Sequence, residues 1–159
     1  MIHFPSKFED AHQSIGYLFI KVYHLWHRDI KQALKKLDLT HPQFVVLTTL
    51  GYLSKSNREV TQVMIAKHSD MDVMTVSTIL KNLEKGNLIS RIASLTDTRS
   101  KVVSLTLQGR RLLEEAVPIV ESIDGSFFST LEEQQEDLRL LLLRLALKEE
   151  NAYLDTESE

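Results

Sequence analysis

Apolar residues recur every three or four positions through most of the chain, and this spacing predicts amphipathic helices. The first such run extends from Ile15 to Leu37 and predicts one long helix. The sequence THPQ follows, in which Thr40 can cap a second helix and Gln43 can complete a capping box. That second helix is short and apolar, and we expect it over residues 44–53.

Two further helical patterns lie in the middle of the chain. The first is expected to end in the sequence HSDMD, where Asp70 tolerates a turn conformation. Asp72 can cap the second, which runs from Val73 to Lys85 and has one apolar face and one polar face. Gly86 and Asn87 both accept a left-handed conformation, so they predict the end of this helix.

The pattern then changes to two short extended runs on either side of a polar turn. The runs are LISRIAS (88–94) and KVVSLTL (101–107), and apolar residues alternate along the second as in a half-buried strand. They predict a β-hairpin whose turn carries Asp97, Arg99 and Lys101. Because a hairpin turn needs no charge, these three residues indicate contact with something outside the protein.

Two more helices complete the prediction. Thr106 opens a helix that contains Pro118, where we expect a kink or a missing hydrogen bond. The sequence TLEE (130–133) has the form of a capping box and precedes the final helix, LRLLLLRLAL (138–147). Since the final helix is apolar on nearly every face, we expect it to lie in a dimer interface.

Charge is distributed unevenly along the chain. Residues 1–57 have a net charge of +3, residues 58–111 of +4 and residues 112–159 of −10. A polyanion would be attracted to the basic part and repelled by the acidic part. The alternative is solvated surface charge without any partner.

Composition narrows the class of protein. The 159 residues are 43% hydrophobic and include no cysteine, which excludes disulfides, a cysteine nucleophile, a thiol redox sensor and a Cys-ligated zinc site. The sequence has no glycine-rich phosphate loop, zinc motif or nucleophile–base pair, so we expect neither an enzyme nor a cofactor. It also shows no signal peptide and no run long enough to span a bilayer, and we therefore expect a cytoplasmic protein without membrane contact.

The order of the predicted elements is that of a helix-turn-helix followed by a wing. The second helix of such a motif fits the major groove of DNA, and the hairpin turn can reach the neighbouring minor groove. A narrow minor groove concentrates negative potential and favours arginine. Arg99 suits that contact, and Asp97 could hold its guanidinium by a charge-assisted hydrogen bond.

The segment from Ile65 to Leu113 resembles the winged helix-turn-helix of the MarR family of bacterial transcription regulators. The resemblance is carried by the junction LEKGNLISR, by Asp97-x-Arg99 in the wing, and by Leu105-Thr106 and Gly109-Arg110 after it. The preceding LTHPQFVVL and the long helices at both ends extend the match over nearly the whole chain.

This resemblance implies a fold that is mainly α with a small β-hairpin. A single MarR-like domain would cover residues 1–159, with a winged helix-turn-helix core over about 40–110 and dimerisation helices over about 9–37 and 107–150. It further implies a homodimer that binds double-stranded DNA at a palindromic operator. The protein would be a repressor that a small aromatic or phenolic effector releases from DNA.

Two sets of site residues follow from the resemblance. The DNA-contact set lies on the recognition helix and the wing: Met74, Thr75, Thr78, Lys81, Asp97, Arg99 and Lys101. The effector set lies where the dimerisation helices are expected to meet the DNA-binding lobe: Tyr17, Tyr23, Trp26, His27 and Phe44.

Each of these sets could also have a purely structural role. The recognition-helix threonines can form an ordinary polar face, and the aromatic set can be ordinary core and interface packing. His24 and His27 lie one turn apart, but two ligands do not make a metal site, so we expect none. Basic residues that either contact phosphates or are simply solvated are Lys67, Lys81, Lys85, Arg91, Lys101, Arg110 and Arg111.

Two rival functions also stay open. One is a small-molecule-binding dimer without specific DNA affinity, which the uncharged Thr75 and Thr78 would permit. The other is a helical protein-interaction module that uses the acidic residues 130–159 and is indifferent to Arg99.

Overall fold

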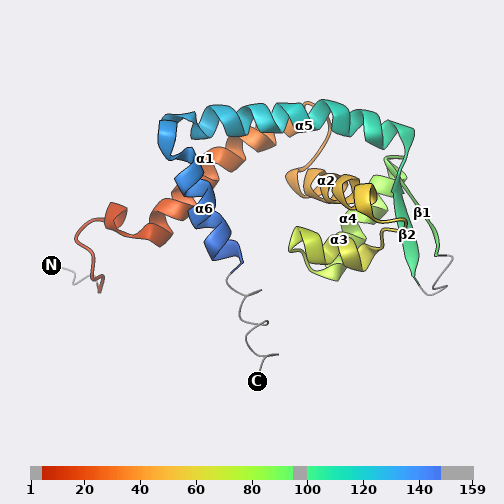
Figure 1. Ribbon diagram of the computed structural model, residues 1–159, viewed down its shortest axis with the longest axis horizontal. Coiled ribbons are helices and arrows are strands. Elements are labelled where there is room, and N and C mark those ends of the chain that lie inside the picture. The colour runs from red at the N-terminus through yellow and green to blue at the C-terminus, as the bar shows by residue number, and fades with distance from the viewer. Residues whose placement is uncertain (1–4, 95–99, 148–159) are drawn as a thin grey trace, which may run out of the picture. The chain divides into compact units, whose positions relative to one another are not determined.

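The computed structural model describes residues 5–94 and 100–147, and it divides into two compact units, residues 1–122 and 123–159 (Figure 1). The elements of the first unit are a 3-10 turn η1 (Ala11–Gln13), α1 (Ile15–Lys35), α2 (His41–Ser56), α3 (Gln62–Ser69), α4 (Val73–Lys85), β1 (Ile89–Ala93), β2 (Lys101–Leu105) and most of α5 (Leu107–Phe128). The second unit contains the end of α5, the 3-10 segment η2 (Ser129–Gln134) and α6 (Gln135–Ala146). The predicted fold class, mainly α with one β-hairpin, is confirmed.

Side-chain caps start helices at the predicted residues. The Gln43 N–H donates to the Thr40 hydroxyl at 3.3 Å and the Thr40 N–H donates to the Gln43 side chain at 2.9 Å, which completes the capping box of α2. The Thr75 N–H donates to the Asp72 carboxylate at 2.8 Å at the start of α4. The predicted span of α2, 44–53, was too short, because the helix begins directly after its cap at His41 and continues to Ser56.

Left-handed residues end the helices around the helix-turn-helix. Asp70 has φ 55° and ends α3, so three residues separate α3 from α4. Asn87 has φ 57° and follows α4. Aspartate and asparagine adopt this conformation more readily than other non-glycine residues, because their short side chains bond locally.

The two strands of the wing pair antiparallel, with Ile89 opposite Leu105. Val102 and Val103 are both buried, at 7% and 1% exposure, in place of a strict alternation along β2. The cause is a segment distant in sequence: the Val103 N–H donates to the Val60 carbonyl at 2.8 Å, so residues before α3 cover the second edge of β2.

The junction between β2 and α5 depends on Thr106 and Gly109. The Thr106 hydroxyl donates to the Asn87 carbonyl at 2.7 Å and accepts the Gly109 N–H at 3.0 Å, so α5 begins where the sequence predicts. Leu107, expected in the strand, is instead the first residue of α5. A Cβ on Gly109 would lie 2.0 Å from the Leu88 carbonyl oxygen, so only glycine fits here.

One expectation for the C-terminal helices was wrong and the other agrees with the structure. Helix α5 continues through Pro118, and because proline has no N–H, one backbone hydrogen bond of the helix is missing there, as expected. The expected capping box at TLEE does not form: Glu132 has φ 48° and ψ −118°, and the Thr130 hydroxyl donates to the Phe127 carbonyl at 3.2 Å. Helix α6 therefore begins at Gln135 without a side-chain cap.

The core of the first unit is built from the C-terminal half of α1, from α2 to α4 and from the hairpin. Its largest fully buried side chains are Ile30, Leu34, Val46, Leu47, Leu50, Ile65, Val76, Leu80, Leu83, Ile89 and Val103. Because these residues come from every element around the helix-turn-helix, α4 and the base of the wing are held on one packed body.

Candidate nucleic-acid interface

Helix α4 presents a polar face to solvent and an apolar face to the core. The exposed face carries Met74, Thr75, Thr78 and Lys81, and the buried face carries Val76, Ile79, Leu80 and Leu83. Met74 is 77% exposed, so its apolar side chain is accessible on this face. All four predicted recognition-helix residues therefore share one accessible surface, which we call the α4 face.

The N-terminal turn of the α4 face is fixed by Asp72. Its carboxylate accepts the Thr75 N–H at 2.8 Å and the Thr75 hydroxyl at 2.5 Å. Two hydrogen bonds from Thr75 hold the pKa of Asp72 below its usual value. The bond from the Thr75 side chain has the larger effect and the bond from its backbone N–H the smaller. Thr75 thus has a fixed orientation on the exposed side of α4.

The lowered pKa of Asp72 predicts a dependence of stability on pH. Because the folded value lies below the unfolded value of 3.8, the stabilising contribution is fully present above about pH 4 and is lost as the pH falls through the folded value. Asp72→Asn keeps a helix cap but removes the titrating charge. We expect urea unfolding followed by circular dichroism to show a steeper loss of stability as the pH falls below about 4 in the wild type than in this variant; parallel curves would contradict the assignment.

The base of the wing is held by contacts that the sequence did not indicate. The Ser94 hydroxyl donates to Glu59 at 2.7 Å and the Ser94 N–H donates to the Ser100 carbonyl at 3.0 Å. These bonds bring together Ser94 and Ser100, the two described residues on either side of positions 95–99. Asp97 and Arg99 lie outside the described residues, so their roles stay predictions, while Lys101 is exposed at the start of β2.

Among the other basic candidates, Arg91 has a partner within the protein. Its Nε donates to Glu84 at 3.0 Å, its second nitrogen also pairs with Glu84, and only 14% of its side chain is exposed. The guanidinium of Arg91 lowers the pKa of Glu84, which keeps the pair ionised. This ion pair ties α4 to β1 and gives Arg91 a structural role, whereas Lys67 and Lys85 are exposed.

Three of the five predicted effector residues lie together. Tyr23, Trp26 and His27 on α1 gather with His41, the first residue of α2, and we call these four the ring cluster. Tyr23 stacks on His27 with centroids 5.1 Å apart, and His41 lies 5.0 Å from His27 and 5.5 Å from Trp26. The sequence did not indicate His41, because it is the first residue of α2, directly after the cap Thr40, and is not part of a periodic pattern.

The other two predicted effector residues are placed differently. Phe44 is 8% exposed and belongs to the core. Tyr17 packs edge-on against His12, with centroids 5.7 Å apart, and is not part of the ring cluster. In the described parts of the chain no three His, Asp or Glu residues are placed to hold a metal ion. None of the helices there has both the length and the apolar character needed to cross a bilayer.

Comparison with known proteins agrees with this architecture. A family model described as an ArnR1-like winged-helix domain matches residues 35–122. The chain is 39% identical over 124 residues to the HTH-type transcriptional regulator YdcH of Bacillus subtilis, a protein itself described as uncharacterised; the match covers 78% of this chain and 84% of YdcH. Its fold also matches the MarR family protein Rv2887 of Mycobacterium tuberculosis in complex with p-aminosalicylic acid, with a TM-score of 0.64 and 29% identity. The match covers 84% of this chain and 98% of Rv2887.

The chain belongs to the MarR family. A third similarity is to a protein in complex with DNA: the structure of the Staphylococcus aureus MepR–DNA complex matches with a TM-score of 0.75 and 33% identity, over 85% of this chain and 98% of MepR. Like its relatives, this MarR-family protein is a DNA-binding transcriptional regulator. The α4 face and the wing are the two parts of its winged helix domain that carry the predicted DNA contacts.

Proposed function

We propose that this MarR-family protein is a homodimeric repressor that binds a palindromic operator and is released from it by a small aromatic effector. The observation that carries the proposal is the α4 face: an accessible helix surface, held by a packed helix-turn-helix directly before a wing. It acts in the cytoplasm, where bacterial DNA lies, and has no catalytic role. MepR is known in complex with DNA, and Rv2887 with p-aminosalicylic acid.

The α4 face fits the major groove by its chemistry. Met74 and the methyl group of Thr75 suit apolar contact with thymine methyl groups, and the Thr78 hydroxyl can bond to base edges. Lys81, one turn further along α4, suits a phosphate. In this arrangement base contacts give the specificity and basic side chains around them fix the position on the duplex.

Exposed apolar surfaces in each unit support a dimer. In the first unit the N-terminal half of α1 exposes Ile15 at 84%, Phe19 at 58% and Ile20 at 50%. In the second unit α6 has no buried residue, and its exposed leucines are Leu140, Leu141, Leu142, Leu143 and Leu145. Contiguous apolar patches of this kind mark interaction sites, and a two-fold dimer would bury the same patches on both copies.

The ring cluster is the proposed effector site. Tyr23, Trp26 and His27 offer aromatic faces against which a planar ligand could stack. His41 joins them from α2, so a ligand there would contact both a helix of the dimer surface and a helix of the winged helix core. A change at this junction would alter how the two recognition helices are spaced, which is a means of releasing DNA.

The wing provides a test of the DNA-binding proposal. We expect Arg99→Ala to weaken binding to the operator by at least about tenfold, or about 1.4 kcal/mol, because the negative potential of a narrow minor groove favours an inserted arginine. Fluorescence anisotropy across a salt series, with circular dichroism to check the fold, measures this. Arg28→Ala on α1, which removes an exposed cation paired with Asp29, is the matched control.

The outcomes separate the rival functions. Loss of affinity in the Arg99 variant alone supports a wing that reads the minor groove. If wild type and variant bind all duplexes alike, the small-molecule-binding dimer is favoured. If instead binding of any partner depends on residues 130–159 and not on Arg99, the protein is an interaction module.

A further inference from the structure

We propose that a basic cleft in the first unit is a second ligand site, and that it binds a small organic anion. The cleft opens between the C-terminal end of α2, the segment 57–60, β2 and the first turn of α5, and its volume is about 370 Å³. No residue of the α4 face or of the ring cluster lines it. The volume lies at the lower end of small-ligand sites, which run from roughly 300 to 1,000 Å³, and suits a molecule with one ring.

The charged side chains of the cleft are all cationic. Lys55, Arg58 and Arg110 line it, and no acidic residue does. Within the described part of the chain neither guanidinium has a carboxylate within 4.0 Å, in contrast to Arg91. Lys55 instead lies over the ring of Tyr52, 4.7 Å from its centroid. The two arginines are therefore available to an anion.

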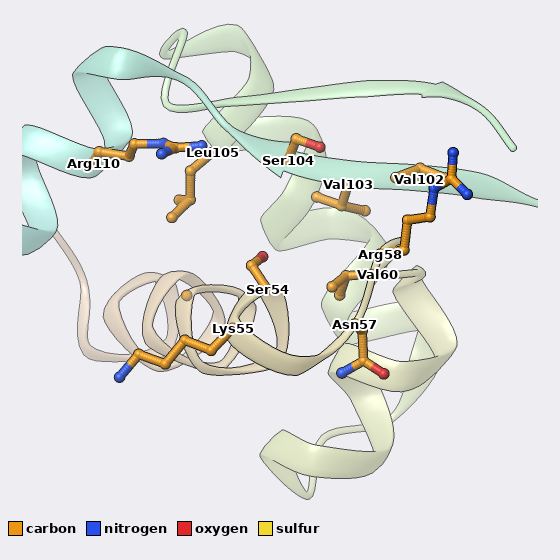
Figure 2. A pocket seen from close by; sticks show the side chains of 11 residues that line it. Ser54, Lys55, Asn57, Arg58, Val60, Val102, Val103, Ser104, Leu105 and Arg110 are labelled. Carbon is orange, nitrogen blue, oxygen red and sulfur yellow. The ribbon is translucent and has the colours of Figure 1, made fainter.

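The two guanidiniums lie at opposite ends of the cleft. Figure 2 shows the Arg110 side chain extending over Leu105 and the Arg58 side chain beside Val102, while Lys55 extends away from β2. Arginine presents its N–H groups in a planar fork that matches the two oxygens of a carboxylate. An anion placed along β2 would thus meet a matching donor at either end.

The floor of the cleft adds an apolar surface and an open strand edge. Val60 and Val103 are 3% and 1% exposed and form the buried wall beside Leu105. Since the Val103 N–H points to Val60, and alternate residues of a strand point the same way, the Leu105 N–H is also turned away from β1. The Leu105 N–H lies beyond the contact between Val103 and Val60, and it is placed to donate to an anion in the cleft.

This combination identifies the class of ligand. A carboxylate at the Arg110 end of the cleft would meet that guanidinium beside Leu105, and the apolar wall suits a compact ring, so an aromatic carboxylate fits better than a bare phosphate. Such a ligand would join α2, β2 and α5, and so connect the wing to the long helix. The inference is independent of the proposed effector site at the ring cluster.

The test is a titration of the full-length protein, without DNA, with benzoate and with its neutral analogue benzamide, followed by amide NMR shifts. We expect benzoate to give saturable shifts at residues 54–60 and 102–105, and benzamide to bind there at least about tenfold more weakly. The double variant Arg58→Gln and Arg110→Gln should lose the benzoate shifts. Arg111→Gln, which removes the neighbouring exposed cation outside the cleft, should keep them.

Several results would overturn the proposal. The proposal is wrong if benzoate and benzamide bind equally. It is also wrong if benzoate binds unchanged to a double variant that retains the wild-type circular dichroism, or if the shifts are confined to the ring cluster. Loss of DNA affinity in the double variant, together with no benzoate shifts in the cleft, would show that the arginines contact phosphates. Because no DNA is used in the titration, its failure leaves the regulatory function intact.

Discussion

Replacing Thr78 by glutamate is expected to reduce operator affinity by more than about 100-fold, equivalent to about 2.7 kcal/mol. Thr78 is exposed on the α4 face, and its hydroxyl donates to the Met74 carbonyl of its own helix, at 3.2 Å. A carboxylate at this position would face the phosphates and base edges of the major groove and be repelled by them. Stability should change little, because the side chain contributes nothing to the core.

A matched variant separates this local effect from a change in net charge. Gln32→Glu also adds one negative charge at an exposed helical position of the first unit, but on α1. Anisotropy at one fixed salt concentration should show near wild-type affinity for Gln32→Glu and severe loss for Thr78→Glu. Equal loss in both would indicate a charge effect of the whole protein, and no loss in either would remove the α4 face from the interface.

Replacing Gly109 by alanine is expected to lower the free energy of unfolding by about 3 kcal/mol. The added Cβ would lie 2.0 Å from the Leu88 carbonyl oxygen and 3.0 Å from the carbonyl carbon. These atoms are backbone, so no rotamer change can relieve the overlap, and the start of α5 must move away from the hairpin. The same shift would disturb the hydrogen bond from the Gly109 N–H to Thr106.

The same helix offers a control for the glycine substitution. A Cβ on Gly125 meets no atom within 4 Å, so Gly125→Ala should stabilise the protein by about 0.5–1 kcal/mol through helix propensity. Urea unfolding of the two variants measures the difference. A similar stability in both would mean that the contact between Gly109 and Leu88 does not exist in solution.

Elements fixed by local chemistry were predictable from the sequence. The capping box at Thr40, the cap at Asp72 and the left-handed Asp70 each depend on residues within one turn of each other, and the structure contains all three. The polar face of α4 follows from its period and was also predicted. Local pattern was insufficient at TLEE, because Thr130 bonds backward to Phe127 and Glu132 leaves the helical conformation.

Features that join distant segments could not be predicted. Val102 and Val103 are both buried because residues before α3 pair with β2, and nothing in the hairpin sequence indicates that partner. Packing between separate elements brings His41 of α2 into the ring cluster with residues of α1. It likewise brings Arg58 and Arg110, which are far apart in the sequence, to the same cleft. The roles of Asp97 and Arg99 rest on the family resemblance and stay predictions.

The central claim is that two copies of the α4 face read DNA sequence together. Selection of duplexes from a random pool by the wild-type protein, followed by sequencing, tests it most directly. We predict enrichment of an inverted repeat whose half-sites lie about 10 base pairs apart, or a multiple of that distance, since each recognition helix must meet the same side of the duplex. A pool that remains random after repeated selection, or an enriched sequence without two-fold symmetry, would contradict the account.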